Sequence, residues 1–325
     1  MKISVVVPVY NADRYLQNCF KSLTEQTLWI QGGDQMELIF VDDASADNSL
    51  NSLTEFRDTS PERITVIGLK QNRGPGGARN AGMAVAQGEY IAFMDCDDLI
   101  KPAMYESMYQ KAAGEPEQPD LVDSGVENEA DGTIRFYTAK DVTGFSDVQK
   151  KSTQLLSVGY VWSRIYRRKF LEENRIIFRE NAVMEDQDFL SEVIVRAEYI
   201  TVVDSVFYEY RNVPDSASKR DAESDFFAST LATIQATYNR LRDIPCYEGV
   251  RMAVEYTFWQ LCLLNLQTIE AYADNLIIDE NMKSRMLKIL LQVMKKYTDI
   301  SVENNIYVQK LMPLADQKKI QTDLF

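Results

Sequence analysis

Apolar, largely β-branched runs alternate with segments of helical periodicity in the first part of this chain, and this alternation constrains the fold more than any other feature. Residues 3–9 form a nearly continuous run of this kind, which is typical of a parallel strand covered on both faces. Similar runs follow at 37–41, 64–69 and 90–93, with amphipathic segments between them. Strands that alternate with helices predict βαβ units, and therefore an α/β fold with a mostly parallel sheet flanked by helices.

Polar side chains follow the predicted strands. The carboxyl ends of parallel strands meet at one edge of the sheet, and ligands of open α/β sheets bind beyond that edge. Folding alone would not require unusual polar residues at four strand ends, so we expect a ligand site there. The residues concerned are Tyr10-Asn11, Asp42-Asp43, Asn72-Arg73 and Asp95 to Asp98.

The acidic group after the strand at 90–93 predicts a cation site. Side chains alternate along an extended chain, so Asp95 and Asp97 point to one side and Cys96 to the other. Mg²⁺ or Mn²⁺ takes one or two protein carboxylates and completes its shell with water and phosphate oxygens. The alternative is a solvated acidic turn after a core strand.

Composition excludes several classes of function. A formal net charge of −14 argues against a nucleic-acid partner, because phosphates need a cationic surface. The chain contains no histidine, so acid–base catalysis must fall to a carboxylate, lysine, tyrosine or cysteine. The four cysteines lack zinc-like or disulfide-like spacing, which indicates reduced thiols. Because no segment is typical of a signal peptide or a membrane span, we expect a cytoplasmic protein.

The pattern changes in the last third of the chain. Residues 114–147 are rich in glycine and proline and predict loops and short strands, and a further strand is expected at 200–208. Beyond about residue 221 only amphipathic helical segments are found, at 225–242, 250–273 and 280–297. We therefore expect an α/β domain at 1–220 and an all-helical domain at 221–325.

Five motifs together resemble family 2 glycosyltransferases of the GT-A fold, a Rossmann-like nucleotide-diphospho-sugar transferase fold. They occur in the family's order and at roughly its spacing: SVVVPVYN, VDDASADNS, NRGPGGARNAG, GEYIAFMDCDD and EDQDF. The resemblance covers about residues 1–215. It implies an inverting transfer of a sugar from a nucleotide donor, usually UDP-linked, with Mg²⁺ or Mn²⁺. It also divides the first domain into a nucleotide-sugar-binding part (1–113) and an acceptor part (114–220).

The resemblance assigns the nucleoside to the ends of the first two strands. It implies that Pro8, Tyr10 and Asn11 contact the nucleoside, with the Tyr10 ring against the base. One member of the pair Asp42 and Asp43 would bond the base. Alternatively, Asn11 caps the next helix, and either aspartate caps the following turn.

The glycine-rich turn at 74–77 resembles a phosphate cradle before a helix. The resemblance places Arg73, Gly74 and Arg79 near the nucleotide, where an arginine can pair with phosphate or stack on the base. The alternative for Arg79 is a surface arginine that caps a turn. Neither a dinucleotide-binding nor a Walker pattern is present.

The resemblance also assigns the metal. Asp97 would be the direct ligand, and Asp95 would lie nearer the ribose and the metal. Some members of the family supply a histidine as a further metal or phosphate ligand. In this chain that role is absent or falls to Arg211, Ser216 or Ser218.

Asp186 resembles the family's catalytic base, which takes the proton from the acceptor hydroxyl, and Glu185 is the alternative base. As a structural alternative, the two residues are an acidic pair at a helix amino terminus, favoured by the helix dipole. Trp162 is expected either as a wall of the acceptor site or as part of the core.

The sequence as a whole therefore predicts an inverting glycosyltransferase in cell-surface polysaccharide or glycoconjugate synthesis. Its expected partners are a nucleotide-sugar donor and a glycan or lipid-linked acceptor. The basic helix at 280–297 leaves open a peripheral contact with the inner face of the membrane, packing on the parent domain, or a homodimer. Two other functions stay in view: a sugar-nucleotide nucleotidyltransferase and a non-catalytic nucleotide-sugar-binding scaffold protein.

Overall fold

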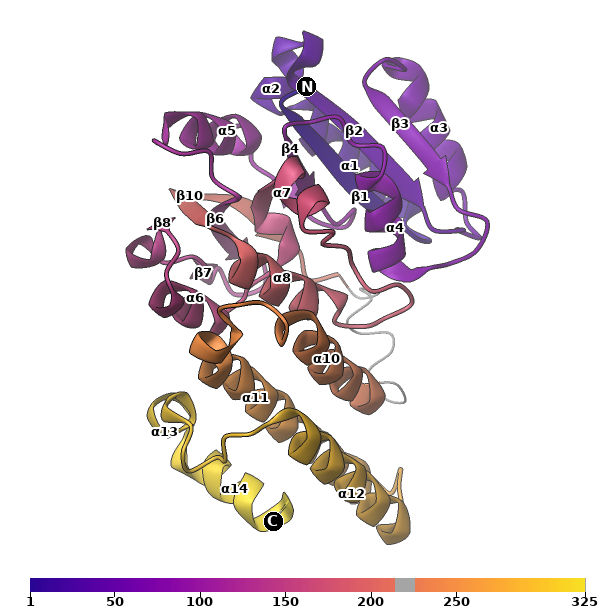
Figure 1. Cartoon of the computed structure of the whole chain (residues 1–325). Coiled ribbons are helices and arrows are strands. Elements are labelled where there is room, and N and C mark those ends of the chain that lie inside the picture. The colour runs from indigo at the N-terminus through magenta and orange to yellow at the C-terminus, as the bar shows by residue number, and fades with distance from the viewer. Residues whose placement is uncertain (214–225, 325) are drawn as a thin grey trace.

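The computed structural model describes residues 1–213 and 226–324, and they form a mixed sheet with flanking helices followed by a layer of helices (Figure 1). The first four strands lie where the apolar runs predict them. They pair in parallel in the order β3-β2-β1-β4, and β1 and β4 are buried along nearly their whole length. Their bounds are β1 (Ile3–Val9), β2 (Met36–Asp42), β3 (Ile64–Gly68) and β4 (Tyr90–Phe93).

Helices connect these parallel strands, as the alternating pattern requires. Helix α4 packs against β1 and β2. It follows β3 in the chain, so its amino terminus lies at the edge where the parallel strands end. The connecting helices are α1 (Asp13–Thr24), α2 (Thr27–Gln31), η1 (Gly33–Gln35), α3 (Ser49–Thr59) and α4 (Gly74–Met83).

The second half of the sheet is mixed. Strand β9 is antiparallel to both β4 and β6, and β6 is parallel to β10, so β10 ends at the same edge as β4. The α/β fold with a sheet flanked by helices is thus confirmed, and the parallel pairing is interrupted at β9. The elements of this half are β5 (Leu99–Ile100), α5 (Met104–Gly114), β6 (Leu121–Asn128), β7 (Ile134–Arg135), η2 (Lys140–Val142), β8 (Gly144–Phe145), α6 (Val148–Leu155), η3 (Val161–Ser163), β9 (Arg164–Arg167), α7 (Arg168–Glu173), α8 (Glu185–Arg196) and β10 (Tyr199–Tyr210).

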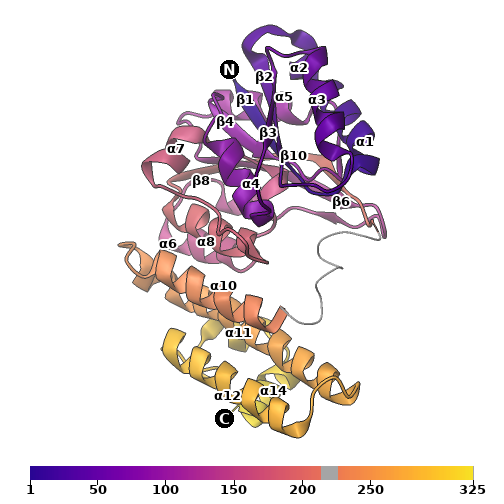
Figure 2. The ribbon, with the colours of Figure 1, turned by 90° about the vertical axis from the view of Figure 1, so that its right-hand side faces the viewer.

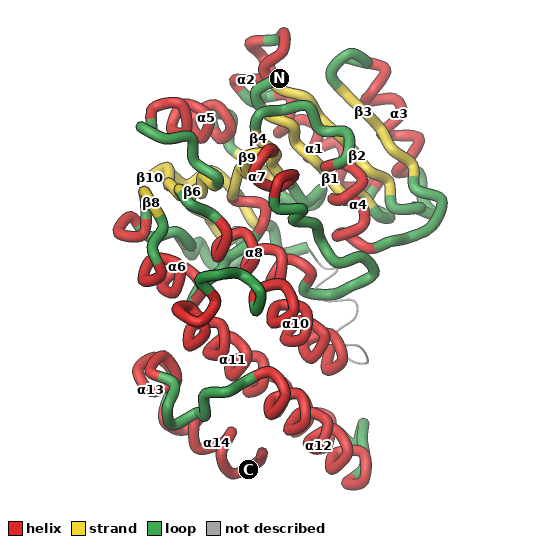
Figure 3. Tube along the Cα trace, in the orientation of Figure 1, coloured by secondary structure: helices red, strands yellow, loops and turns green. Residues whose placement is uncertain are grey.

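The described residues after 225 are helical, in agreement with the predicted all-α segment (Figure 3). This helical layer lies against one side of the α/β part, where α10 runs alongside α8 (Figure 2). The predicted boundary at residue 220 lies outside the described residues. No described helix combines the length and apolar character needed to cross a membrane. The helices are α10 (Phe226–Leu241), α11 (Tyr247–Asp274), α12 (Glu280–Tyr297), α13 (Ile306–Leu311) and α14 (Leu314–Leu324), of which the last two were not predicted.

Candidate active site

The loop after β4 is tied to the end of β10. The Tyr208 hydroxyl accepts a hydrogen bond from the Asp95 backbone N–H (3.3 Å) and donates one to Asp98 Oδ2 (2.7 Å). Asp98 Oδ1 accepts from the Arg211 backbone N–H (2.8 Å). Burial, together with the charges of Asp95 and Asp97, raises the pKa of Asp98 well above its usual range. The acidic loop and the segment that begins at Arg211 therefore share one hydrogen-bonded anchor.

Arg79 is the centre of the acidic cluster. Its side chain is buried on α4, where Nη2 bonds Asp95 Oδ1 (2.8 Å) and Nη1 bonds Glu185 Oε1 (2.6 Å). Burial lowers the pKa of Arg79, but the neighbouring carboxylates outweigh it and raise the pKa above the usual value, so the guanidinium stays charged. The structure excludes the surface alternative for Arg79, because one buried cation joins α4, the β4 loop and α8.

Helix α8 begins with the predicted acidic pair. Met184, directly before it, has the left-handed backbone conformation (φ 60°), which redirects the chain into the helix. Asp186 is half-buried. Burial first, then the charge of Glu185, raises the pKa of Asp186 to about 7 against the opposing effect of Arg79. The predicted donor contact Asp95 and the predicted acidic pair at the start of α8 thus lie near the same cation, Arg79, although they come from distant parts of the sequence.

The Asp95–Asp97 pair suits a hard cation that relies on few protein ligands. Asp97 is half-buried, and Asp95 gives one oxygen to Arg79. Within residues 1–213 and 226–324, no three histidine, cysteine or acidic side chains converge on a common point that could hold a metal. Carboxylate oxygens are the donors that Mg²⁺ and Mn²⁺ prefer, and both ions complete their shells with water and phosphate oxygens. The donor set therefore fits such a cation bound together with a diphosphate.

The residues at the end of β1 are partly open to solvent. The Tyr10 ring is 45% exposed, whereas Pro8 is half-buried within β1. Asn11 has a positive φ of 49° and does not cap α1. Instead its Oδ1 accepts from the Ala46 N–H (2.8 Å), and its N–H donates to Ser45 Oγ (2.9 Å). These two hydrogen bonds join the end of β1 to the turn after β2.

The carboxylates of Asp42 and Asp43 are both buried, each with a backbone partner. Asp42 Oδ2 accepts from the Ser45 N–H (3.1 Å), and its buried Oδ1 has no hydrogen-bond partner. Asp43 Oδ1 accepts from the Arg73 N–H (2.7 Å), and burial raises the pKa of Asp43. Both aspartates thus shape the turns around the strand end, and which of them would bond a base stays open.

The amino terminus of α4 is packed against the segment that precedes α8. Gly74 has a φ of +72°, and Arg73 pairs with Glu180 (Nε to Oε2, 2.9 Å). A Cβ at Gly76 would lie 2.1 Å from the Arg179 carbonyl oxygen and 3.1 Å from Glu185 Cγ. The glycines of the predicted cradle thus allow the segment before α8 to approach α4 closely. This approach also brings the acidic pair at the start of α8 close to α4.

Gly76→Ala is therefore expected to destabilise the protein by about 1–3 kcal/mol, because the added methyl group must displace either α4 or the segment. Thermal unfolding measures the change. Gly114→Ala is the matched control: Gly114 ends α5 without a positive φ, and a Cβ there meets nothing within 4 Å. The control should change stability by no more than about 0.5 kcal/mol. Equal losses for both variants would contradict the close-approach argument.

Trp162 lies inside an aromatic stack. Its ring is 4.0 Å from Tyr208 and 4.7 Å from Tyr160, centroid to centroid, and nearly parallel to both. Trp162 is buried, whereas Tyr160 is 40% exposed and is the solvent-facing ring of the two. Burial, followed by nearby groups that include Tyr137, Tyr210 and Asp186, raises the pKa of Tyr160.

The sequence analysis did not single out Tyr160 or Tyr208, and it included Asp98 in the acidic group after the strand without giving it a role. A signal for Tyr208 was present in the pair Tyr208-x-Tyr210, because residues two apart on a strand share a face. Tyr160 carried no such signal, because Trp162 lies in the short helix η3. The Arg211 side chain lies 3.6 Å (Nε) from Glu129 Oε2, and its backbone bonds Asp98. Ser216 and Ser218 lie outside the described residues.

Comparison with known proteins gives consistent results. Residues 4–175 match the sequence family described as "Glycosyl transferase family 2". The chain is 37% identical over 276 residues to the glycosyltransferase GlyG of Streptococcus pneumoniae, covering 78% of this chain and 89% of that protein. It is 29% identical over 232 residues to the poly(ribitol-phosphate) beta-glucosyltransferase of Bacillus spizizenii, covering 69% of this chain and 33% of that protein.

A solved structure shares the fold over the full length of the chain. The crystal structure of S. aureus TarS 1-349 in complex with UDP-GlcNAc superposes with a TM-score of 0.73 at 18% identity, covering 100% of this chain and 90% of that one. The helical layer is included in this coverage.

Proposed function

Because the chain belongs to glycosyl transferase family 2 and is a glycosyltransferase, we propose that it transfers a sugar with inversion from a UDP-sugar to a hydroxyl acceptor during cell-surface polymer synthesis. The observation that carries the mechanism is the Arg79 cluster, which gathers Asp95, Glu185 and Asp186 at the strand-end edge. The UDP-GlcNAc bound to TarS and the polymer acceptor named for the Bacillus spizizenii relative support the choice of donor and acceptor class.

In this proposal, the donor lies along the strand ends. The exposed Tyr10 ring offers a face to the base, and one of Asp42 and Asp43 bonds its edge. Arg73, Gly74 and Arg211 lie toward the diphosphate. Mg²⁺ or Mn²⁺, held by Asp97 with Asp95 beside it, would supply positive charge that offsets the charge of the departing diphosphate.

Asp186 takes the proton from the acceptor hydroxyl as that oxygen attacks the anomeric carbon from the face opposite the diphosphate. A carboxylate whose pKa is about 7 can accept this proton near neutral pH. Glu185 is held by Arg79 at 2.6 Å, which favours Asp186 over Glu185 as the base. The acceptor sugar packs on Tyr160, whose ring is backed by Trp162.

Calorimetry tests the donor site. Binding of UDP, GDP, CDP and dTDP is measured with and without Mn²⁺. We expect binding of UDP that depends on Mn²⁺ and that Asp97→Ala weakens by at least about tenfold, because the mutant loses the proposed metal ligand. Asp58→Ala, an exposed carboxylate on α3, is the control and should leave binding unchanged. A folded protein that binds none of the four nucleotides would contradict the donor site, whereas one that binds UDP but transfers no sugar would argue for the scaffold alternative.

The nucleotidyltransferase alternative is not favoured. Such enzymes place a glycine-rich loop with a basic residue after the first strand, where this chain has Tyr10-Asn11-Ala12-Asp13. Membrane contact and dimer formation through the C-terminal helices stay predictions. Flotation with anionic vesicles and sedimentation, respectively, would test them.

A further inference from the structure

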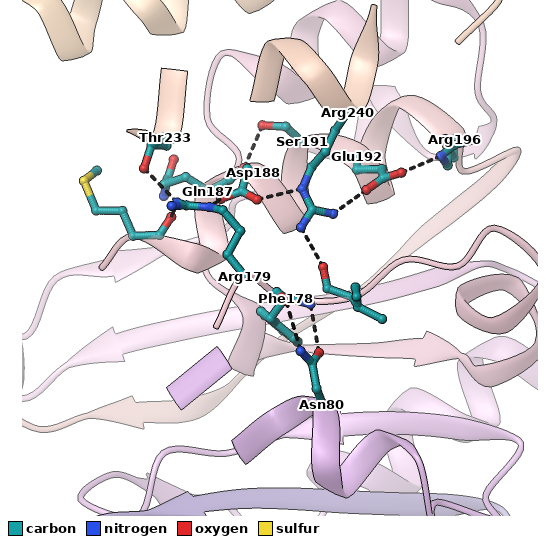
Figure 4. A network of polar contacts seen from close by, with 12 residues as sticks. Asn80, Phe178, Arg179, Gln187, Asp188, Ser191, Glu192, Arg196, Thr233 and Arg240 are labelled. Carbon is teal, nitrogen blue, oxygen red and sulfur yellow. Dashed lines mark hydrogen bonds and ion pairs between the residues drawn. The ribbon is translucent and has the colours of Figure 1, made fainter. Parts of the chain in front are cut away.

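The helix that carries Asp186 is joined to α10, the first of the described C-terminal helices, by a network in which buried carboxylates pair with partly exposed arginines (Figure 4). At its centre, Asp188 on α8 is fully buried and holds two arginines. Arg179 Nε lies 2.7 Å from Asp188 Oδ1, and Arg240 Nε lies 2.7 Å from Asp188 Oδ2. Arg240 belongs to α10, so a cation from the C-terminal layer neutralises a carboxylate two residues after Asp186.

Arg240 uses all sides of its guanidinium. Nη1 donates to Glu192 Oε2 on α8 (2.6 Å), and Nη2 donates to the Ile177 carbonyl oxygen (2.8 Å). Glu192 also accepts from Arg196 Nε (2.9 Å). The planar guanidinium group has several donors in fixed directions, so it can hold α8 and the segment at Ile177 in one relative geometry. The single ammonium group of a lysine cannot do this.

Arg179 acts on the turn that starts α8. Its Nη2 donates to the Met184 carbonyl oxygen (3.3 Å) and to Thr233 Oγ1 on α10 (2.9 Å). Met184 is the residue with a left-handed backbone directly before Glu185 and Asp186. Such a conformation is unfavourable for a side chain with a Cβ and persists only where its surroundings hold it.

The opposite side of the same segment is held by α4. Asn80 donates through Nδ2 to the Phe178 carbonyl oxygen (3.0 Å), and its Oδ1 accepts from the Phe178 N–H (2.9 Å). Arg79, the neighbour of Asn80, bonds Glu185. The segment at 177–184 is therefore clamped between α4 and α10, and the position of Asp186 depends on both helices.

We propose that Arg240 is a positioning residue, which acts through Asp188 and the segment at 177–184 to place Asp186 for catalysis. The inference rests on the proposed function, because it takes Asp186 as the base. It makes the C-terminal helical layer part of the catalytic apparatus. A displacement of a catalytic group by about 1 Å costs on the order of a hundredfold in rate, so a loosened α8 would show in turnover.

The test compares Arg240→Ala with wild type for UDP release from UDP-GlcNAc with Mn²⁺, together with calorimetric UDP binding. We expect turnover to fall by at least about tenfold while the Kd for UDP stays within about twofold, since Arg240 contacts no residue of the proposed donor site. Arg240→Lys should retain part of the turnover that Arg240→Ala loses, because lysine keeps the positive charge but lacks the several fixed donors of the guanidinium group.

Arg251→Ala is the matched control. Arg251 is also a partly buried arginine of the helical layer, but its ion-pair partners are Glu248, Glu255 and Asp299, all within that layer. It should lower the melting temperature without changing turnover by more than about twofold. If Arg240→Ala does not fold, Thr233→Val, which removes one bond to Arg179, replaces it. It should lower turnover by more than the twofold allowed for the control, and a folded Thr233→Val variant with unchanged turnover would overturn the inference.

The outcomes separate the two proposals. Wild type that releases no UDP from any UDP-sugar would overturn the proposed function itself. Active wild type with a folded Arg240→Ala variant of unchanged turnover would overturn the positioning inference alone. Two further results would also overturn the positioning inference, because each would indicate a general loss of structure. One is an equal fall in turnover in Arg251→Ala, and the other is a Kd for UDP that rises in Arg240→Ala by the same factor as turnover falls.

Discussion

Asp186→Asn is expected to lower sugar transfer by about a thousandfold, while UDP binding stays within about twofold of wild type. The amide is nearly isosteric with the carboxylate but cannot accept the proton of the acceptor hydroxyl. Asp186 lies at the start of α8 and is not part of the proposed diphosphate or nucleoside contacts, so donor binding should persist. The measurements are steady-state rates and calorimetry on the same preparations.

The pH dependence of wild type follows from the same group. Burial and the charge of Glu185 raise the pKa of Asp186 to about 7, so the base is protonated and inactive in acid. The value of kcat/KM should therefore rise with pH and level off above about 7. Asp186→Asn should remove this acid limb, whereas Glu185→Gln should retain the limb but move it to lower pH, because the variant loses a charge that raises the pKa of Asp186. If Asp186→Asn transferred sugar at the wild-type rate while Asp97→Ala abolished transfer, Asp186 would not be the base, although the enzyme assignment would stand.

Arg79→Ala is expected to lower the free energy of unfolding by about 3–5 kcal/mol, because it leaves buried negative charge uncompensated. Glu185 is buried and Asp95 is less than a third exposed, and both use Arg79 as their ion-pair partner. Chemical denaturation at neutral pH measures the loss. Metal-dependent UDP binding should weaken as well, since Asp95 would lose the contact that orients it.

Arg57→Ala provides the matched control for this prediction. Arg57 pairs with the neighbouring Asp58 at the surface of α3, and both side chains are exposed. Such pairs contribute at most about 1 kcal/mol, so the control should change stability little. Equal effects of the two arginines would show that the Arg79 cluster is not the buried electrostatic centre that its geometry indicates.

The α/β fold and the place of the site could be predicted because both depend on local patterns. The apolar run at 3–9 predicts β1 at its observed bounds, and four polar strand ends lie at one edge because parallel strands share a direction. The antiparallel strand β9 could not be foreseen, since the short run at 164–167 carries no signal for the direction in which it pairs. Helix α13 could not be foreseen, because its six residues are too few to show a helical period.

The amino-acid sequence by itself determined the kind of chemistry available to this protein. The absence of histidine leaves acid–base catalysis to a carboxylate, lysine, tyrosine or cysteine, and the motifs Asp95-x-Asp97 and Glu185-Asp186 supply carboxylates in an order that resembles the family's. What only the tertiary structure decided is how these groups act on one another. Arg79 becomes a buried partner of Asp95 and Glu185, and Arg240 of the helical layer pairs with Asp188 of the α/β part. The pKa values of these carboxyl groups and the positions of their side chains depend on burial and on nearby charges. Burial and nearby charges in turn come from residues that are far apart in the sequence and meet only when the chain is folded.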